Sequence, residues 1–215
     1  MMKGSGTSKE TARLLRDRYS PIPRDENEKI MDGIQKLLLI ARDPVKPLQA
    51  FLDETGKLIH RLFDFKEIGI GTKSKTDDLF RYNVLIGFSS DAEKARRKLA
   101  YTYEEMTDSN KYPGGVTIAR KTEFMLVELQ SYKSGEEGTF NRPSLLTKER
   151  SSIEDIIEGD YIDIYFFGRN DEVIGWIELA GTRTGKMPSR NTIRWLELIS
   201  SMLASVISER DSIKI

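Results

Sequence analysis

Two apolar stretches near the carboxyl end of the chain constrain its fold most strongly, because only four residues separate them. Residues 161–167 (YIDIYFF) and 172–180 (EVIGWIELA) are rich in β-branched and aromatic residues, and the connection between them is GRND. A link this short makes a tight hairpin, whereas a parallel pair of strands needs a much longer crossover. The sheet of this protein is therefore predicted to be largely antiparallel.

A second hairpin is predicted upstream. Residues 65–71 (FKEIGIG) and 80–88 (FRYNVLIGF) flank the polar stretch TKSKTDD. The second of these runs alternates strictly, so one face is expected to carry Phe80, Tyr82, Val84, Ile86 and Phe88. A further strand is expected at residues 124–129, just after a Gly-containing loop.

Helical periodicity surrounds these strands. Apolar residues recur at helical spacing in residues 25–42, 44–63 and 189–208, with Asp43-Pro44 separating the first two helices. Ser90 and Glu93 are spaced as a capping box that opens another helix, and residues 151–160 (SSIEDIIEGD) are expected to form a short one. Helices at both ends of an antiparallel sheet predict an α+β fold.

The chain divides into three predicted regions. Residues 1–24 are polar and basic and are expected to form a flexible arm, residues 25–43 an extension helix, and residues 44–215 the domain itself. A basic arm that touches a partner is the alternative interpretation of the first region.

Charge and cysteine content exclude several classes of function. The 215 residues hold 34 Lys plus Arg and 34 Asp plus Glu, so no net field attracts nucleic acid or an anionic membrane surface. Cysteine is absent, which excludes disulfides, thiolate metal sites and thiol redox chemistry. There is no apolar run of about 18 residues and no secretory leader pattern, so we expect a cytoplasmic protein with no membrane or nucleic-acid partner.

The stretch IIEGDYIDIYFFGRNDEVIGWIELAG, followed by the helix WLELISSMLASVISE, resembles a GAF domain, a small sensor module related to PAS domains. The stretch YPGGVTIARKTEFMLVE is similar to the family's Gly-rich entry to its ligand cavity, and the resemblance covers residues 44–210. It implies an antiparallel sheet with amino- and carboxyl-terminal helices packed on one face, and loops and short helices over a small-molecule pocket on the other. In many relatives the terminal helices also pair with a second subunit. The three long helices offer more apolar surface than one sheet face needs, which independently predicts a homodimer.

Departures from the family pattern exclude several classes of ligand and chemistry. Without cysteine the chain has neither the pigment attachment of bilin-binding relatives nor the catalytic groups of the methionine-sulfoxide reductase branch. His60 is the only histidine, and it is interpreted as structural, so no metal and no cofactor is expected. Asn110 and Lys111 begin a pattern similar to the cyclic-nucleotide signature, but no matching Asp-Glu pair is evident, and that ligand class stays open.

The predicted pocket residues come from two places. Tyr112, Arg120 and Phe124 lie where the Gly-rich loop meets the sheet edge, a placement that rests partly on the resemblance. Tyr82, Trp176 and Glu178 would extend the pocket along the strands. Glu178 is the odd charge in an apolar strand and either enters a pocket or reaches solvent at the strand's end; solvent is the commoner case, because a buried carboxylate needs partners.

Two other polar groups invite functional interpretations. Gly181, Gly185 and Lys186 resemble a phosphate-binding loop, but the glycine spacing is one residue short and Met187 stands where Ser or Thr is required, so the segment is interpreted as a connector. Arg183, Lys186 and Arg190 could hold an anion near a helix amino terminus, although a solvated loop that happens to be basic is the preferred interpretation. The acidic residues of the region are interpreted as a solvated face: Glu154, Asp155, Glu158, Asp160 and Asp163.

The expected function is non-catalytic. One histidine cannot build a two-His metal site, the lack of cysteine excludes a Cys nucleophile, and no Ser-His-Asp arrangement is evident around His60. No kinase, cyclase or DNA-binding segment is recognisable, so we expect a dimeric small-molecule sensing module that signals to a separate partner protein. The alternatives are a dimerisation scaffold with a vestigial pocket, and an enzyme that uses carboxylates or the basic loop.

Overall fold

The computed structural model describes residues 5–19, 22, 25–43, 45–108, 115–130, 136–146 and 148–212. Its centre is one six-stranded sheet with the order β2-β1-β6-β5-β4-β3, and every neighbouring pair is antiparallel. The strands are β1 (Phe65–Lys73), β2 (Phe80–Ile86), β3 (Gly115–Ala119), β4 (Thr122–Met125), β5 (Tyr161–Phe167) and β6 (Val173–Thr182). The predicted α+β class and antiparallel pairing are confirmed.

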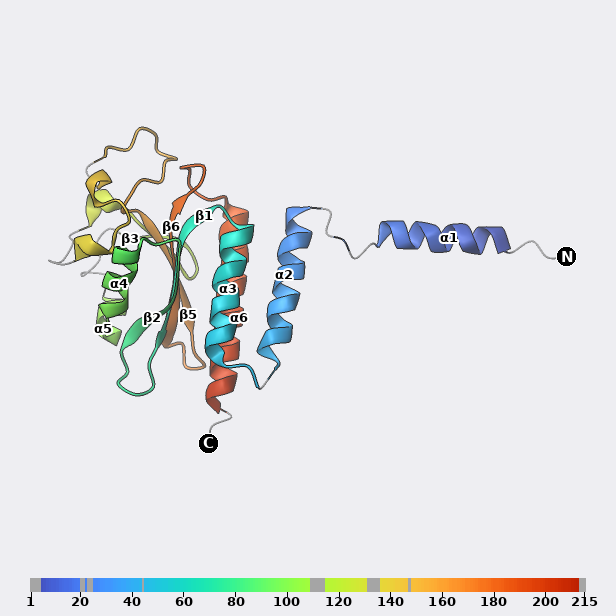
Figure 1. Ribbon diagram of the computed structural model, residues 1–215, viewed down its shortest axis with the longest axis horizontal. Coiled ribbons are helices and arrows are strands. Elements are labelled where there is room, and N and C mark those ends of the chain that lie inside the picture. Colours follow the sequence, from blue (N-terminus) through green and yellow to red (C-terminus); the bar gives the residue numbers. More distant parts are fainter. Residues whose placement is uncertain are drawn as a thin grey trace.

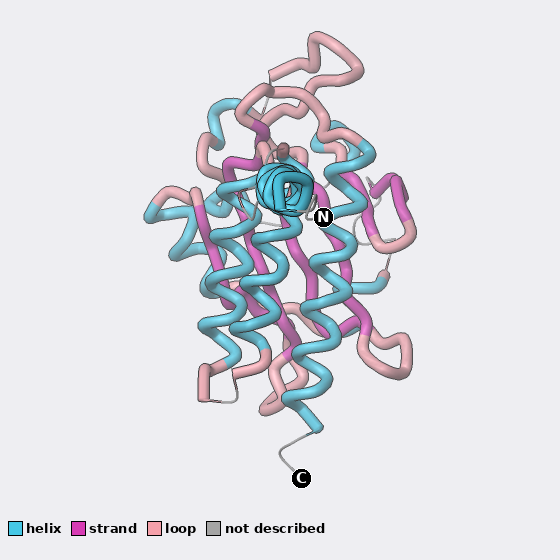
Figure 2. The backbone as a smooth tube through the Cα atoms, turned by 90° about the vertical axis from the view of Figure 1, so that its right-hand side faces the viewer, coloured by secondary structure: helices cyan, strands magenta, loops and turns pink. Residues whose placement is uncertain are grey.

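Helices cover one face of this sheet in two layers (Figures 1 and 2). Helices α3 (Leu48–Leu62) and α6 (Arg190–Ser212) lie directly on the strands, and α2 (Glu26–Ala41) packs outside them. Gly33 lets α2 pack closely on α3, since a Cβ at this position would overlap the Leu58 side chain of α3. Asn27 of α2 accepts a hydrogen bond from Trp195 Nε1 of α6 at 3.1 Å. The helix predicted from residue 44 begins at Leu48, after Pro47 as its cap.

The alternation of the strands divides the core between two faces. Toward the helices lies a continuous apolar cluster that includes Ile70, Ile164 and Ile177, all fully buried. On the other face a smaller cluster holds Phe80, Tyr82, Val173 and Trp176. Gly71 is required there, because a Cβ at this position would overlap the Trp176 indole.

The predicted single face for residues 80–88 is wrong. A register shift between Ile70 and Gly71 pairs Gly71 with Tyr82 and Ile70 with Val84, so Asn83 is an extra residue in β2. Such a bulge interrupts the two-residue alternation. As a result Tyr82 joins the Trp176 cluster, whereas Val84 joins the core under the helices.

Short elements cover the second sheet face. They are α4 (Ser90–Lys98), α5 (Tyr103–Thr107), and the 3-10 turns η1 (Val127–Leu129), η2 (Glu136–Thr139) and η3 (Pro143–Leu145). Helix α4 is capped by Ser89, one residue before the predicted cap, and Ser89 Oγ accepts from the Ala92 backbone N–H. The strand expected at residues 124–129 is instead the end of the β3–β4 hairpin followed by η1.

The helix predicted at residues 151–160 is also wrong, since this segment is a chain of turns. Asp160 fixes it from within: its carboxylate accepts from the backbone N–H groups of Val127 and Ile157 and pairs with Arg150 at 3.0 Å. A carboxylate that satisfies local backbone donors favours a turn over a helix.

Helix α1 (Ser5–Arg18) lies apart from the rest of the molecule (Figure 1). It falls within the region predicted as a basic arm, and Leu14 and Leu15 on it are exposed. Among the helices of the described residues, none combines the length and the apolar character needed to cross a membrane.

Candidate functional site

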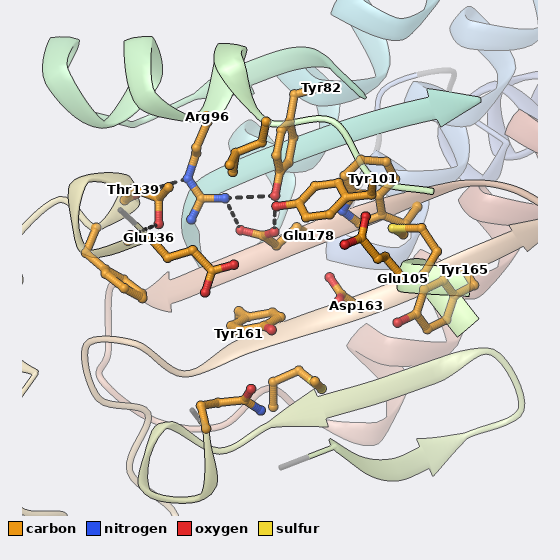
Figure 3. A pocket seen from close by; sticks show the side chains of 16 residues that line it. Tyr82, Arg96, Tyr101, Glu105, Glu136, Thr139, Tyr161, Asp163, Tyr165 and Glu178 are labelled. Atoms are coloured by element: carbon orange, nitrogen blue, oxygen red, sulfur yellow. Dashed lines mark hydrogen bonds and ion pairs between the residues drawn. The ribbon is translucent and has the colours of Figure 1, made fainter. Parts of the chain in front are cut away.

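A small cavity lies between the second face of the sheet and its cover of α4, α5 and the segment around η2. It encloses about 80 Å³, above the roughly 10–15 Å³ that one water molecule needs. Strands β2, β5 and β6 form its floor and contribute Tyr82, Asp163 and Glu178 (Figure 3). Its walls combine aromatic rings with ionisable groups, a combination that is typical of small-molecule pockets.

A buried ion pair closes one end of the cavity. Arg96 of α4 and Glu178 of β6 form a salt bridge in which each side chain is only 8% exposed. Tyr82 OH donates to Glu178 at 2.5 Å and accepts from Arg96 at 3.0 Å. Arg96 Nε donates to the Thr139 carbonyl, and the guanidinium lies 4.4 Å from the centre of the Phe88 ring. The charges of this group are therefore mutually satisfied.

Glycine makes room for this arrangement. Gly69 stands opposite Glu178 in the β1–β6 ladder, and a Cβ on Gly69 would lie 2.8 Å from the Tyr82 ring. Burial raises the pKa of Tyr82 well above its usual value, so the phenol stays neutral and donates its proton. Burial opposes the charge on Arg96, but Glu178, Tyr82 and Tyr101 together outweigh it and raise the pKa of the guanidinium.

Asp163 occupies the middle of the cavity floor on β5. Its side chain projects from the strand between those of Tyr161 and Tyr165 (Figure 3). Asp163 is 8% exposed, and its Oδ1 has no hydrogen-bond partner in the part of the chain that the structure describes. Burial raises the pKa of Asp163 well above its usual range, and Glu178 and Glu123 add to the rise. Gln130 Nε2, which also lines the cavity, is the second buried polar atom without a partner among these residues.

Three of the predicted pocket residues come together in this cavity: Tyr82, Trp176 and Glu178. The alternative that Glu178 reaches solvent is wrong, because the strand runs beneath the cover and Arg96 provides a buried partner. Asp163 and Asp160 are likewise buried, which corrects the interpretation of the acidic residues as a solvated face.

Phe124 and Arg120 do not line the cavity. Phe124 pairs with Ile162 and faces the helices, while its neighbour Met125 pairs with Tyr161 and faces the cavity. Phe124 and Arg120 instead line a separate groove between the β3–β4 hairpin and α6. The alternation of β4 thus turns Phe124 away from this cavity, and a ligand-binding role for Phe124 and Arg120 stays a prediction that concerns the separate groove. Tyr112, Asn110 and Lys111 lie outside the described residues.

The three predicted anion-binding residues do not converge. Arg183 donates to the carbonyl oxygens of Phe63 and His60, and Lys186 pairs with Asp155 at 2.6 Å. Arg190 lies in the groove beside α6. The Lys186 hydrogen bond lowers the pKa of Asp155 to about 2, as expected for a structural ion pair. Gly181 and Gly185 both have positive φ, which suits a connector.

Sequence reasoning missed Arg96 and Asp163 as cavity residues. The motif YIDIY carried a signal for Asp163, because strict alternation places Tyr161, Asp163 and Tyr165 on one face and Ile162 and Ile164 on the other. Arg96 sits in a basic helix end with no local signal. Among the described residues, no group of three His, Cys, Asp or Glu side chains is arranged to hold a metal ion.

Comparison with family models finds no match, and no curated protein matches the chain. Solved structures do. The GAF domain of a phosphoenolpyruvate-protein phosphotransferase from Acinetobacter is 11% identical, with a TM-score of 0.53, 86% of this chain covered and 96% of that chain. The GAF domain of a sensor histidine kinase from Pseudomonas syringae pv. tomato is 12% identical, with a TM-score of 0.52 and coverages of 95% and 96%. A GAF domain/HD domain protein from Geobacter sulfurreducens is 14% identical, with a TM-score of 0.53 and coverages of 81% of this chain and 97% of that chain.

These likenesses identify the class of domain: an antiparallel sheet between a helical layer and a layer of loops and short helices. The fold is that of a GAF domain, as the sequence resemblance implied.

Proposed function

We propose that this protein is a sensing and regulatory module that binds a small molecule in the cavity over β5 and β6 without transforming it. The observation that carries the proposal is the cavity itself, whose floor holds a buried carboxylate with one oxygen that has no partner among the described residues. A vestigial pocket would be expected to fill with apolar side chains, because unpaired buried polar groups are costly. Similar solved domains include those of a sensor histidine kinase and of a methyl-accepting chemotaxis protein.

The signal would pass through β5 and β6 to α6. The cavity residues Asp163 and Glu178 alternate with the apolar side chains on which α6 packs. Glu197 of α6 also accepts from the Lys121 backbone N–H and the Thr122 hydroxyl, at 2.9 and 3.0 Å. A ligand that binds one arrangement of the floor better than another therefore biases the position of α6. A separate partner protein would respond to that change.

The ligand proposal is tested by thermal unfolding in the presence of the small-molecule fraction of a cell extract. Specific binding to the folded protein must raise its Tm. Leu99→Trp fills the cavity and should abolish the rise, whereas Leu129→Trp makes the same change at an exposed position and should keep it. A ligand recovered chemically unchanged after incubation supports binding without turnover. The absence of any rise in the wild-type protein would leave the scaffold interpretation.

We further propose that the protein dimerises through α2 and α6. A groove between these helices is lined by both apolar and polar side chains, and its apolar members include Leu38 and Leu198, which are 43% and 50% exposed. Exposed leucines on adjacent helices form the kind of patch that a second copy covers. Light scattering should show a dimer for the wild-type protein and a monomer for Leu38→Glu/Leu198→Glu. Ile153→Glu, at a position 89% exposed elsewhere, is the control that should stay dimeric. A monomeric wild-type protein at micromolar concentration would refute this part.

A further inference from the structure

Asp163 places a buried carboxyl group in the cavity without a full set of hydrogen-bond partners among the described residues. Its carboxyl group is buried on the floor, and one oxygen has no partner among the described residues. A buried, unpaired carboxyl group carries a desolvation cost that a sequence can avoid with Asn or Ser. A group supplied from outside the protein would remove that cost.

The neighbours of Asp163 increase this cost. Glu123, Asp163 and Glu178 stand directly opposite one another across β4, β5 and β6. Like charges in this register destabilise a sheet. The guanidinium of Arg96 is committed to Glu178, Tyr82 and the Thr139 carbonyl, so its charge offsets only part of the cost at Asp163. The described lining holds one guanidinium and several carboxyl groups: Arg96, Glu105, Glu136, Asp163 and Glu178. Asp163 has an oxygen without a partner among the described residues, and a buried carboxyl group in that state favours a positively charged occupant.

Aromatic rings complete a site for an organic cation. Tyr161 and Tyr165 flank Asp163 on the floor, and Tyr101 stands edge-on to Trp176 with ring centres 6.1 Å apart (Figure 3). Ring faces attract ammonium and guanidinium groups, most strongly where water is excluded. A metal ion fits less well, because no three ligating side chains converge among the described residues. Gln130 Nε2, which has no partner among the described residues, adds a donor for an acceptor oxygen elsewhere on the same ligand.

We propose that the cavity is a receptor site for a small organic cation whose ammonium or guanidinium group pairs with Asp163 between Tyr161 and Tyr165. This inference rests on the sensing function proposed above and names its class of ligand. Arg96, Tyr82 and Glu178 form the rigid end wall of the site rather than its charge-binding group.

The test compares small probes that differ in charge. Ethanolammonium, propylammonium and methylguanidinium are the cations, propanol and acetamide the neutral probes, and propionate the anion. Calorimetry measures affinity, and carbon-detected NMR of aspartate carboxyl groups reports on Asp163 in the wild-type protein without any substitution. We expect a cation to bind and to shift the Asp163 resonance.

Two variants locate the charge contact. Asp163→Asn should weaken cation binding by about 30-fold or more, as expected when a buried charge pair loses one partner. Glu104→Gln, which removes one negative charge at an exposed position of α5 beside the cavity, should bind like the wild type. Equal binding by wild type and Asp163→Asn would overturn the assignment.

The remaining outcomes separate this inference from the sensing function. If only neutral or anionic probes bind, the cation is wrong and the sensing function stands. If no probe binds while an extract fraction still raises the Tm, the cation is again wrong. If neither probes nor extract bind, both proposals fail.

Discussion

Replacing Arg96 by methionine is expected to lower the free energy of unfolding by about 3–5 kcal/mol, because it strands Glu178 in the interior without its counter-charge. The structure supports a value in this range. Both side chains are 8% exposed, so neither reaches enough water to be screened. Arg96 also loses its hydrogen bond to the Thr139 carbonyl and its contact with the Phe88 ring. Glu178→Leu should cost a similar amount, since it strands Arg96 instead.

The double variant Arg96→Met/Glu178→Leu isolates the interaction. With both charges gone, its destabilisation should fall short of the sum of the single variants by about 2 kcal/mol or more. Urea unfolding at neutral pH gives each free energy by linear extrapolation. Arg97 and Glu93 on the same helix provide the matched control, because they form an ion pair at 3.2 Å with both side chains 43% exposed. Their coupling should stay below about 0.5 kcal/mol. A buried pair that couples no more strongly than this exposed pair would refute the account of the cavity wall.

Three further variants follow from the same geometry. Burial raises the pKa of Asp163 in the folded protein, so the folded state binds this proton more tightly than the unfolded chain does. The wild-type protein should therefore lose stability as pH rises from about 4 through the raised pKa, by about 1.4 kcal/mol for each pH unit between the two values. Urea titrations across this range should show Asp163→Asn gaining stability relative to the wild type as pH rises; parallel curves would contradict the burial argument. Gly71→Ala should cost about 1–3 kcal/mol, because its methyl group overlaps Trp176, whereas the Cβ of Gly138→Ala would meet Ala95 at an ordinary 3.7 Å and should leave the Tm nearly unchanged. Asp160→Asn should cost about 1–3 kcal/mol in the same assay, since it removes one of the two carboxylates that pair with Arg150 and weakens two backbone hydrogen bonds, while Glu128 still pairs with Arg150 at 2.9 Å, and a change below about 0.5 kcal/mol would show that the turn does not depend on this carboxylate.

The antiparallel architecture was predictable because short connections leave a strand pair no other choice. The GRND link and the stripe of the last helix each determine one local geometry, and both occur in the structure. The face of the sheet that each residue occupies was harder to predict from the sequence. Phe124 was assigned to the pocket from its nearness to a loop, but its pairing with Ile162 turns it toward the helices. Such a decision depends on register, which a single strand does not reveal.

The polar part of the site was harder still. Glu178 and Arg96 are 82 residues apart in the chain, and nothing in either local sequence announces the other. Sequence alone therefore places such a carboxylate in solvent, because burial is favourable only with a partner that the local sequence does not reveal. The bulge at Asn83 is similar, because the sequence of β2 alternates perfectly and only the pairing with β1 exposes the extra residue. Contacts between segments far apart in the chain therefore determine both the burial of Glu178 and the bulge at Asn83.

Strand β5 lines the cavity and the helical core with separate sets of residues. Tyr161, Asp163 and Tyr165 meet the cavity, while Ile162, Ile164 and Phe166 hold the helical layer. Each set can change while the other stays fixed, because neighbouring side chains on a strand point in opposite directions. If the cavity binds the proposed ligand, a lineage of such domains could acquire a new chemical specificity through three codons without disturbing its hydrophobic interior, and an engineer could diversify the same three positions in a library with little loss of folded protein.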